Sequence, residues 1–172
     1  MRLGLIVGLV VVVVMLSGLT LAASAKFDRP SRSVTVERVI DAPRDRVWAT
    51  VTAFASYEEW NPYVTSASGA ASEGGELNLR LEAPGSSAED VTVKVLTARF
   101  ERKLRWEDRF VLPGLRDEEV TIRVLKLTPT SVRLFETVRM EGLLAPFADL
   151  DPTLHGLEQM AEALERRAEA TS

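Results

Sequence analysis

The chain has 172 residues, enough for one ordinary domain with an appendage, and a domain of this size can bury a core without disulfides or metals. It contains no cysteine and one histidine, which excludes a disulfide framework, a thiolate nucleophile and a cysteine-ligated metal site. The formal net charge is −4 and no run of basic residues is longer than two, so the electrostatic footprint of a nucleic-acid-binding protein is missing. We expect no nucleic-acid partner, no cofactor and no metal.

The N-terminal segment differs in composition from the rest of the chain. No charged residue occurs from Leu3 to Ala25. About 20 apolar residues can cross a bilayer as a helix, whereas a signal-peptide core needs roughly 7–15, which Leu3–Leu16 supplies before the small-residue site Ala23-Ser24-Ala25. A hydrophobic helix over residues 1–25 therefore fits both a signal peptide and an uncleaved transmembrane anchor, with a linker over 26–32.

The flanks of this run give opposite indications of orientation. Arg2 precedes it, whereas Lys26, Arg29 and Arg32 follow it, and this bias in positive charge favours a cytoplasmic location for the following domain. The Ala-x-Ala site is typical of exported proteins. We expect a membrane-anchored or exported protein on the extracytoplasmic face, with the membrane as a partner through residues 1–25.

The first part of the remaining chain predicts one strand and two short helices. Residues 31–41 alternate apolar with polar side chains, as in a strand with one buried face. Pro43–Phe54 carries apolar residues at helical spacing, with proline in the first turn. A second short helix begins at Ser56, which forms a capping-box pattern with Glu59, and ends at Asn61-Pro62.

The hydrophobic period then changes from 3.6 to 2, which is typical of antiparallel strands with one wet face. The small and polar segment Ser66–Gly75 is expected to be a mobile loop or a sheet edge. Turn sequences separate the strands at Pro84-Gly85, Pro113-Gly114 and Thr128-Pro129-Thr130. The predicted strands that can be located by their alternation are 77–82, 91–95, 104–110, Glu119–Leu127 and Ser131–Met140.

The chain closes with an amphipathic helix of about five turns that begins with Asp151 as N-cap and Pro152 in the first turn. A curved sheet has to cover its apolar face, and this helix is the long amphipathic element available to do so. The sequence therefore predicts an α+β helix-grip fold over residues 33–170: a curved antiparallel sheet of about seven strands wrapped around the C-terminal helix.

This order of elements resembles the START/Bet v 1-like (SRPBCC) superfamily from about Ser33 to about Ala170. The motifs that carry the resemblance are Ile40-Asp41-Ala42-Pro43, Val47-Trp48 and Trp60-Asn61-Pro62. Further segments are similar to its bacterial polyketide cyclase/dehydrase and lipid-transport-like branch, namely Leu104-Arg105-Trp106, Pro113-Gly114-Leu115, Phe135-Glu136 through Gly142-Leu143, and His155–Met160. The resemblance implies a hydrophobic cavity for lipids, sterols, polyketides or similar ligands. It implies no single chemistry, because the superfamily includes carriers, receptors and enzymes.

Two carboxylates are candidate catalytic residues. Glu136 shares the apolar face of its strand, where burial would raise its pKa and suit it to acid or base catalysis. The favoured explanation is a structural carboxylate paired with arginine or backbone N–H groups, because structural ion pairs perturb carboxylates as readily as catalysis does. Asp108 shares the face of Trp106 and also fits a strand end or bulge. Arg38 is a possible counter-ion for both carboxylates, because a buried charge needs a partner.

Other residues are expected to line or close the cavity. His155 lies one turn into the last helix, near acidic residues that complement the helix dipole, and one histidine cannot build a usual metal site. The apolar loop Gly142–Phe147 suits a lid, a membrane-touching lip or ordinary packing. The predicted ligand-binding residues are Trp106, Phe110, Leu134, Glu136, Val138, Phe147, Leu157 and Met160.

These observations favour a non-catalytic binder or carrier of a hydrophobic small molecule or lipid, held at or near a membrane. One alternative is a polyketide cyclase or dehydratase that uses Glu136 and Asp108 as acid and base. A second is a protein-interaction or assembly-helper module. The oligomeric state is left open by the sequence.

Overall fold

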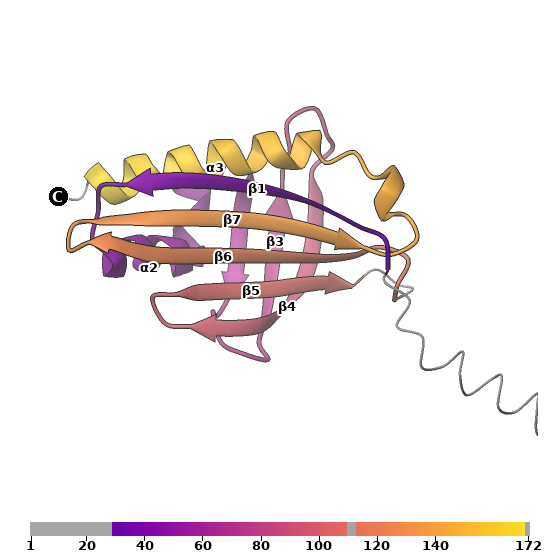
Figure 1. The fold of residues 1–172 in the computed structure, drawn as a ribbon, viewed down its shortest axis with the longest axis horizontal. Coiled ribbons are helices and arrows are strands. Elements are labelled where there is room, and N and C mark those ends of the chain that lie inside the picture. The colour runs from indigo at the N-terminus through magenta and orange to yellow at the C-terminus, as the bar shows by residue number, and fades with distance from the viewer. Residues whose placement is uncertain (1–28, 110–112, 171–172) are drawn as a thin grey trace, which may run out of the picture.

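The computed structural model describes residues 29–109 and 113–170 (Figure 1). Phe110 and the expected N-terminal helix over residues 1–25 lie outside the described residues. Within the described part, no helix combines the length and the apolar character needed to cross a bilayer. The elements, in chain order, are β1 (Ser31–Ile40), α2 (Arg44–Thr52), the 3₁₀ helix η1 (Phe54–Glu59), β2 (Val64–Gly69), β3 (Glu76–Leu81), β4 (Glu89–Arg99), β5 (Lys103–Arg109), β6 (Asp117–Thr128), β7 (Ser131–Glu141), the 3₁₀ helix η2 (Ala145–Phe147) and α3 (Asp151–Ala170).

The seven strands form one antiparallel sheet in the order β1-β7-β6-β5-β4-β3-β2. The first strand pairs with the last, so that Ser31 lies opposite Glu141 and Ile40 opposite Val132. The long helix α3 runs beside β1 for much of its length, and α2 lies near the other end of the strands from η2 (Figure 1). The predicted helix-grip fold, with a curved antiparallel sheet and a long C-terminal helix, is confirmed.

Alternation along the strands explains which face is buried. In β7 every second side chain, from Val132 to Met140, is buried, while the intervening residues are partly or fully exposed. α3 buries a stripe at helical spacing that includes Leu157 and Leu164. The main hydrophobic core therefore lies between the inner face of the sheet and the helices α2, η1 and α3.

Several boundaries differ from the expectations. Ser66 lies in the edge strand β2, so the sheet-edge alternative for Ser66–Gly75 holds for its first residues. Ser56 does not cap a helix, because its hydroxyl donates a hydrogen bond to the carbonyl of Ala53 within a 3₁₀ turn. Asp151 is the first residue of α3, and the Asp149 carboxylate accepts its N–H. β1 begins at Ser31, as the alternation over residues 31–41 predicts, so the strand overlaps the end of the linker expected over 26–32.

Candidate functional site

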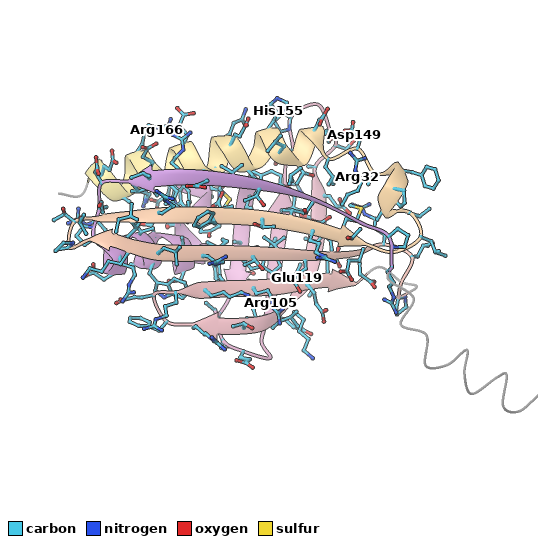
Figure 2. The ribbon with its side chains drawn as sticks, in the orientation of Figure 1. Arg32, Arg105, Glu119, Asp149, His155 and Arg166 are labelled. Atoms are coloured by element: carbon cyan, nitrogen blue, oxygen red, sulfur yellow. The ribbon has the colours of Figure 1, made fainter. Side chains whose placement is uncertain are left out.

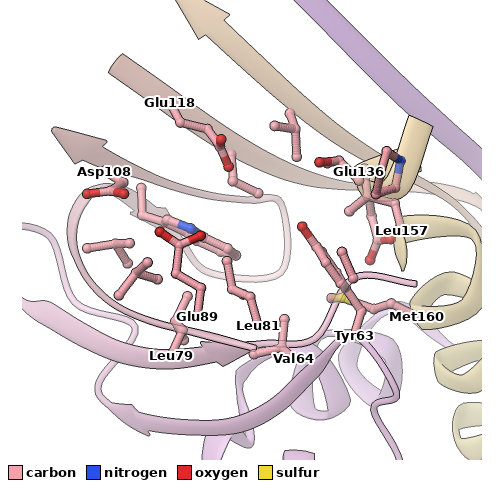
Figure 3. Close-up of a pocket in the computed structure, with 18 of the residues that line it drawn as sticks. Tyr63, Val64, Leu79, Leu81, Glu89, Asp108, Glu118, Glu136, Leu157 and Met160 are labelled. Atoms are coloured by element: carbon pink, nitrogen blue, oxygen red, sulfur yellow. The ribbon is translucent and has the colours of Figure 1, made fainter. Parts of the chain in front are cut away.

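A cavity of about 210 Å³ lies between the inner face of the sheet and the N-terminal half of α3 (Figure 3). Its walls come from β2 to β7, from η1 and from the segment that joins η1 to β2. The mouth of the cavity is marked by exposed lining residues in three places: the β3–β4 connection, the segment before β6 and the segment before α3. The apolar lining consists of Phe54, Val64, Leu79, Leu81, Ala83, Val91, Val93, Trp106, Val120, Ile122, Val138, Pro152, Leu157 and Met160.

Asn61 places one wall of the cavity. Its side-chain oxygen accepts hydrogen bonds from the backbone N–H groups of Tyr63 (3.0 Å) and Val64 (2.9 Å), which closes a turn at Pro62. The turn directs the Tyr63 ring into the pocket (Figure 3). Burial, with help from Glu118, raises the pKa of Tyr63 to about 12, so its hydroxyl keeps its proton.

Glu136 is the deepest polar group of the cavity. It is fully buried on β7, between Val36 of β1 and Ile122 of β6 in register, and neither carboxyl oxygen has a hydrogen-bond partner among the described residues. Burial raises the pKa of Glu136 to about 8, with Arg38 opposing the shift. The group is therefore mostly a neutral carboxylic acid at pH 7, able to donate or accept a hydrogen bond.

Arg38 is not the direct partner of Glu136 that we expected. Its side chain is on the inward face of β1, but its guanidinium donates to the Glu165 carboxylate of α3 at 2.5 Å. The half-buried pair joins β1 to α3. Strand alternation correctly predicted that Arg38 faces inward. It could not show that α3 places the Glu165 carboxylate within hydrogen-bond distance of the Arg38 guanidinium.

Three further carboxylates gather at the mouth. Asp108 on β5 lies directly opposite Glu118 on β6, and Glu89 at the start of β4 faces them across the pocket (Figure 3). The pKa of Asp108 is raised, first by desolvation and then by Glu89. Desolvation also raises the pKa of Glu118, and Asp108 and Glu89 add to it against the opposing charge of Arg116. Both expectations for Asp108 therefore hold: its side chain points inward, and it is the penultimate residue of its strand.

The predicted ligand-binding residues that the structure describes fall into two groups, those that line the cavity and those that do not. Leu134 and Phe147 do not line the cavity: Leu134 packs in the core nearby, and Phe147 in η2 is 84% exposed. Strand alternation cannot tell which inward positions border empty space, and the loop that carries Phe147 turns outward. Phe110 lies outside the described residues. The residues that do line the cavity are Trp106, Glu136, Val138, Leu157 and Met160.

His155 lies away from the cavity, on the outer side of α3 (Figure 2). Its Nδ1–H donates to the carbonyl of Asp151 at 2.8 Å. The outer face of the sheet likewise carries paired charges, such as Arg105 with Glu119 at 3.3 Å (Figure 2). No group of three potential ligands that could hold a metal ion is found among the described residues.

Sequence reasoning missed the polar residues of the mouth other than Asp108, and it missed the two tyrosines. Period-2 alternation contained the signal for two of them, because Glu89 shares a strand face with Val91 and Val93, and Glu118 shares one with Val120. Tyr57 lies in the short 3₁₀ helix η1 and Tyr63 in the segment after it, and both segments are too short for a periodicity to indicate the direction of a side chain.

Comparison with known proteins agrees with this geometry. The model of the family described as polyketide cyclase / dehydrase and lipid transport matches residues 31–170. The chain belongs to this family. The match begins at the first residue of β1 and ends at the last residue of α3, so the polyketide cyclase / dehydrase and lipid transport domain is the whole helix-grip domain. The resemblance to the START/Bet v 1-like superfamily is confirmed, and the domain is one that binds hydrophobic ligands.

Solved structures share the fold at low sequence identity. The domain is similar to a START superfamily protein from Mycobacterium smegmatis, with a TM-score of 0.61 and 24% identity over 83% of this chain and 99% of that chain. It is also similar to norcoclaurine synthase from Thalictrum flavum, a point mutant in complex with a transition-state analogue, with a TM-score of 0.62 and 15% identity over 86% of this chain and 100% of that chain. At these identities the likeness shows the fold alone. No curated protein has a matching sequence.

The same comparisons define a unit for experiments. The helix-grip domain accounts for 99% and 100% of those two solved chains, and it has its own continuous core. We therefore expect residues 29–172 to fold without the N-terminal run.

Proposed function

We propose that this domain binds or carries a compact hydrophobic molecule in its cavity and is held at a membrane by residues 1–25. The cavity carries the proposal, because it joins an apolar lining to a mouth at one end of the sheet. Its volume of about 210 Å³ is below the roughly 300–1,000 Å³ of sites for drug-sized ligands. A short-chain or one- to two-ring molecule suits this space better than a whole phospholipid.

A cavity-filling variant tests the binding half of the proposal. Val138→Phe adds bulk inside the cavity, and Val39→Phe makes the same change at an exposed position of β1. The probe is 1-octanol, titrated into residues 29–172 and followed by NMR chemical shifts. We expect saturable shifts at cavity residues, weakened about tenfold or more by Val138→Phe and unchanged by Val39→Phe. Absence of binding, or equal binding by both variants, contradicts the proposal; circular dichroism confirms that each variant is folded.

The membrane half of the proposal has support from one end of the domain. Leu143, Leu144 and Phe147, the apolar lip, are 69%, 45% and 84% exposed. The lip follows Gly142, whose N–H donates to the carbonyl of Pro30 at 3.0 Å, so the chain enters the domain beside it. A bilayer that held the uncharged run Leu3–Ala25 would lie within a few residues of this lip and of the cavity mouth, which Asp149 borders.

Site-specific labelling tests this arrangement, and the absence of cysteine from the chain makes single labels possible. Phe147→Cys places a fluorescent label on the lip. Phe100→Cys places it on another exposed phenylalanine, 76% exposed, at the turn between β4 and β5 at the opposite end of the sheet (Figure 1). In the full-length protein reconstituted into phosphatidylcholine vesicles, nitroxide-labelled lipids should quench the label at 147 and spare the label at 100. Equal quenching, or none at either site, contradicts membrane contact by the lip.

Glu136 also favours a second candidate function, acid or base catalysis on a polyketide-like ligand. A carboxyl group with a pKa of about 8 inside a binding cavity is near the pKa that suits proton transfer at neutral pH. Glu136→Gln should then abolish turnover of a neutral substrate and leave its affinity largely unchanged. Unchanged turnover removes Glu136 from such a mechanism.

A further inference from the structure

Most of the residues that line the cavity are apolar, but nearly all of its ionisable groups are acidic. The described lining residues include five carboxyl groups and one guanidinium, that of Arg116. Arg116 lies at the mouth, where its guanidinium pairs with the Glu118 carboxylate at 3.7 Å. The carboxyl groups belong to Glu89, Asp108, Glu118, Glu136 and Asp149. Together they give the cavity a negative potential, which attracts cations and repels anionic ligands.

The deepest of these groups has no hydrogen-bond partner within residues 29–109 and 113–170. Both oxygens of Glu136 are buried without a hydrogen bond from any described residue. The Tyr57 hydroxyl is also fully buried at the cavity, but it donates to the carbonyl of Val51 at 2.6 Å. Arg38 is engaged by Glu165. An unpaired buried carboxyl group costs free energy, and a donor supplied by a ligand would offset that cost.

The carboxylates at the mouth would also be stabilised by a positively charged ligand. Asp108 and Glu118 are directly opposite one another on adjacent strands, an arrangement that is destabilising when both are charged. Glu89 faces them (Figure 3). A cation that passes through the mouth relieves this repulsion, so the mouth favours entry of a positively charged molecule.

The aromatic lining also suits a cation. Phe54, Tyr57, Tyr63 and Trp106 all border the cavity, and the faces of such rings attract ammonium groups. The Tyr63 ring projects into the pocket that both Glu136 and the mouth carboxylates border, so aromatic surface is available to a cation bound there (Figure 3).

We propose that the ligand is a compact apolar amine, whose ammonium group pairs with Glu136 while its hydrocarbon part fills the apolar cavity. This inference rests on the proposed function, because it names the chemical class of the molecule that the cavity holds. On binding, the ammonium keeps its proton, and Glu136 releases its own to solvent and becomes the carboxylate partner. Fatty acids of the same length are disfavoured by charge, since they would place a further carboxylate among the acidic groups of this lining.

Three probes of one chain length separate this inference from the proposed function. Octylamine, 1-octanol and octanoate differ only in the polar end, and each is titrated calorimetrically into residues 29–172 at neutral pH. A hydrogen bond to a charged group contributes about 1.5–3 kcal/mol, which is roughly a 10- to 100-fold preference for octylamine over octanol. Binding of octanol with no preference for octylamine overturns the inference and leaves the proposed function standing. Binding of none of the three overturns both.

Variants assign the preference to its residues. Glu136→Gln should bring octylamine to within a few-fold of octanol, whereas Glu119→Gln, on the outer face of β6, should leave the preference unchanged. Asp108→Asn provides a second test at the mouth and should reduce octylamine affinity without changing octanol affinity. A preference that persists in full in both cavity variants, or tighter binding of octanoate, overturns the assignment.

Discussion

The Tyr63 ring packs directly against the backbone of Gly156 in α3: a Cβ built on Gly156 would lie 2.4 Å from Cδ2 of Tyr63. Glycine inside a helix normally lowers stability by about 1 kcal/mol relative to alanine. Here the missing side chain lets α3 approach the segment after η1 closely enough for one ring to belong to the core and to the cavity wall.

Gly156→Ala should therefore destabilise the domain, opposite to the usual effect of this substitution in a helix. The added methyl group overpacks against Tyr63, which costs about 1–3 kcal/mol and exceeds the helix-propensity gain. Urea unfolding of residues 29–172 measures the difference, with Glu158→Ala on the exposed side of α3 as the matched control. A higher urea midpoint for Gly156→Ala would show that the ring moves aside freely.

Asn61→Ala should loosen the same wall by another route. It removes the acceptor for the N–H groups of Tyr63 and Val64, and leaving buried donors unpaired costs about 1–3 kcal/mol. Asn61→Asp keeps an acceptor oxygen at this position and should retain more stability. Hydrogen exchange at the two N–H groups reports the effect directly; exchange that stays as slow in Asn61→Ala as in the wild type contradicts the role assigned to Asn61.

Much of the fold could be predicted because its signals are local and periodic. Three local patterns each identify a secondary-structure element without information from distant parts of the chain. They are the change of period after Pro62, the turn sequences, and the amphipathic pattern of the helix that begins at Asp151. β2 could not be located in the same way, because its residues Val64–Gly69 are mostly small or polar and it forms an edge strand that is held by β3 on one side only.

The site could be predicted only in part, because a cavity is a property of packing. Alternation placed Glu136 and Asp108 on the inward face, and both line the cavity. The same pattern placed Leu134 on that face, but other core side chains pack around Leu134 and it does not border the cavity. Whether Arg38 pairs with Glu136 or with Glu165 depends on the rotation of α3 over the sheet, which no local pattern encodes.

The buried carboxyl group of Glu136 predicts a pH dependence of stability. Its pKa is raised from 4.5 to about 8 on folding, so between these values the folded state binds a proton that the unfolded state has released. This contribution to stability is fully present below pH 4.5 and is lost as the pH rises to 8. Glu136→Gln removes the titration, and it should be more stable than the wild type at pH 8 by on the order of a few kcal/mol and similar to it at pH 5.

Urea unfolding of residues 29–172 at intervals from pH 5 to 8 measures this difference. Glu158→Gln, at an exposed position of α3, should follow the wild-type curve. Parallel curves for Glu136→Gln and the wild type would mean that Glu136 titrates at the same pH in the folded and unfolded states.

Arg38 should govern the titration of Glu136 although the two side chains share no hydrogen bond. The guanidinium opposes the upward shift in the pKa of Glu136, so Arg38→Met, which keeps most of the apolar stem, should move that pKa above about 8. The carboxyl ¹³C shift of Glu136, followed through a pH titration, gives the midpoint. Arg133→Met is the matched control, because Arg133 is on the same strand as Glu136 but pairs with Glu37 on the outer face at 3.2 Å. An unchanged or lower midpoint in Arg38→Met would show that Arg38, held by Glu165, exerts no net field at the base of the cavity.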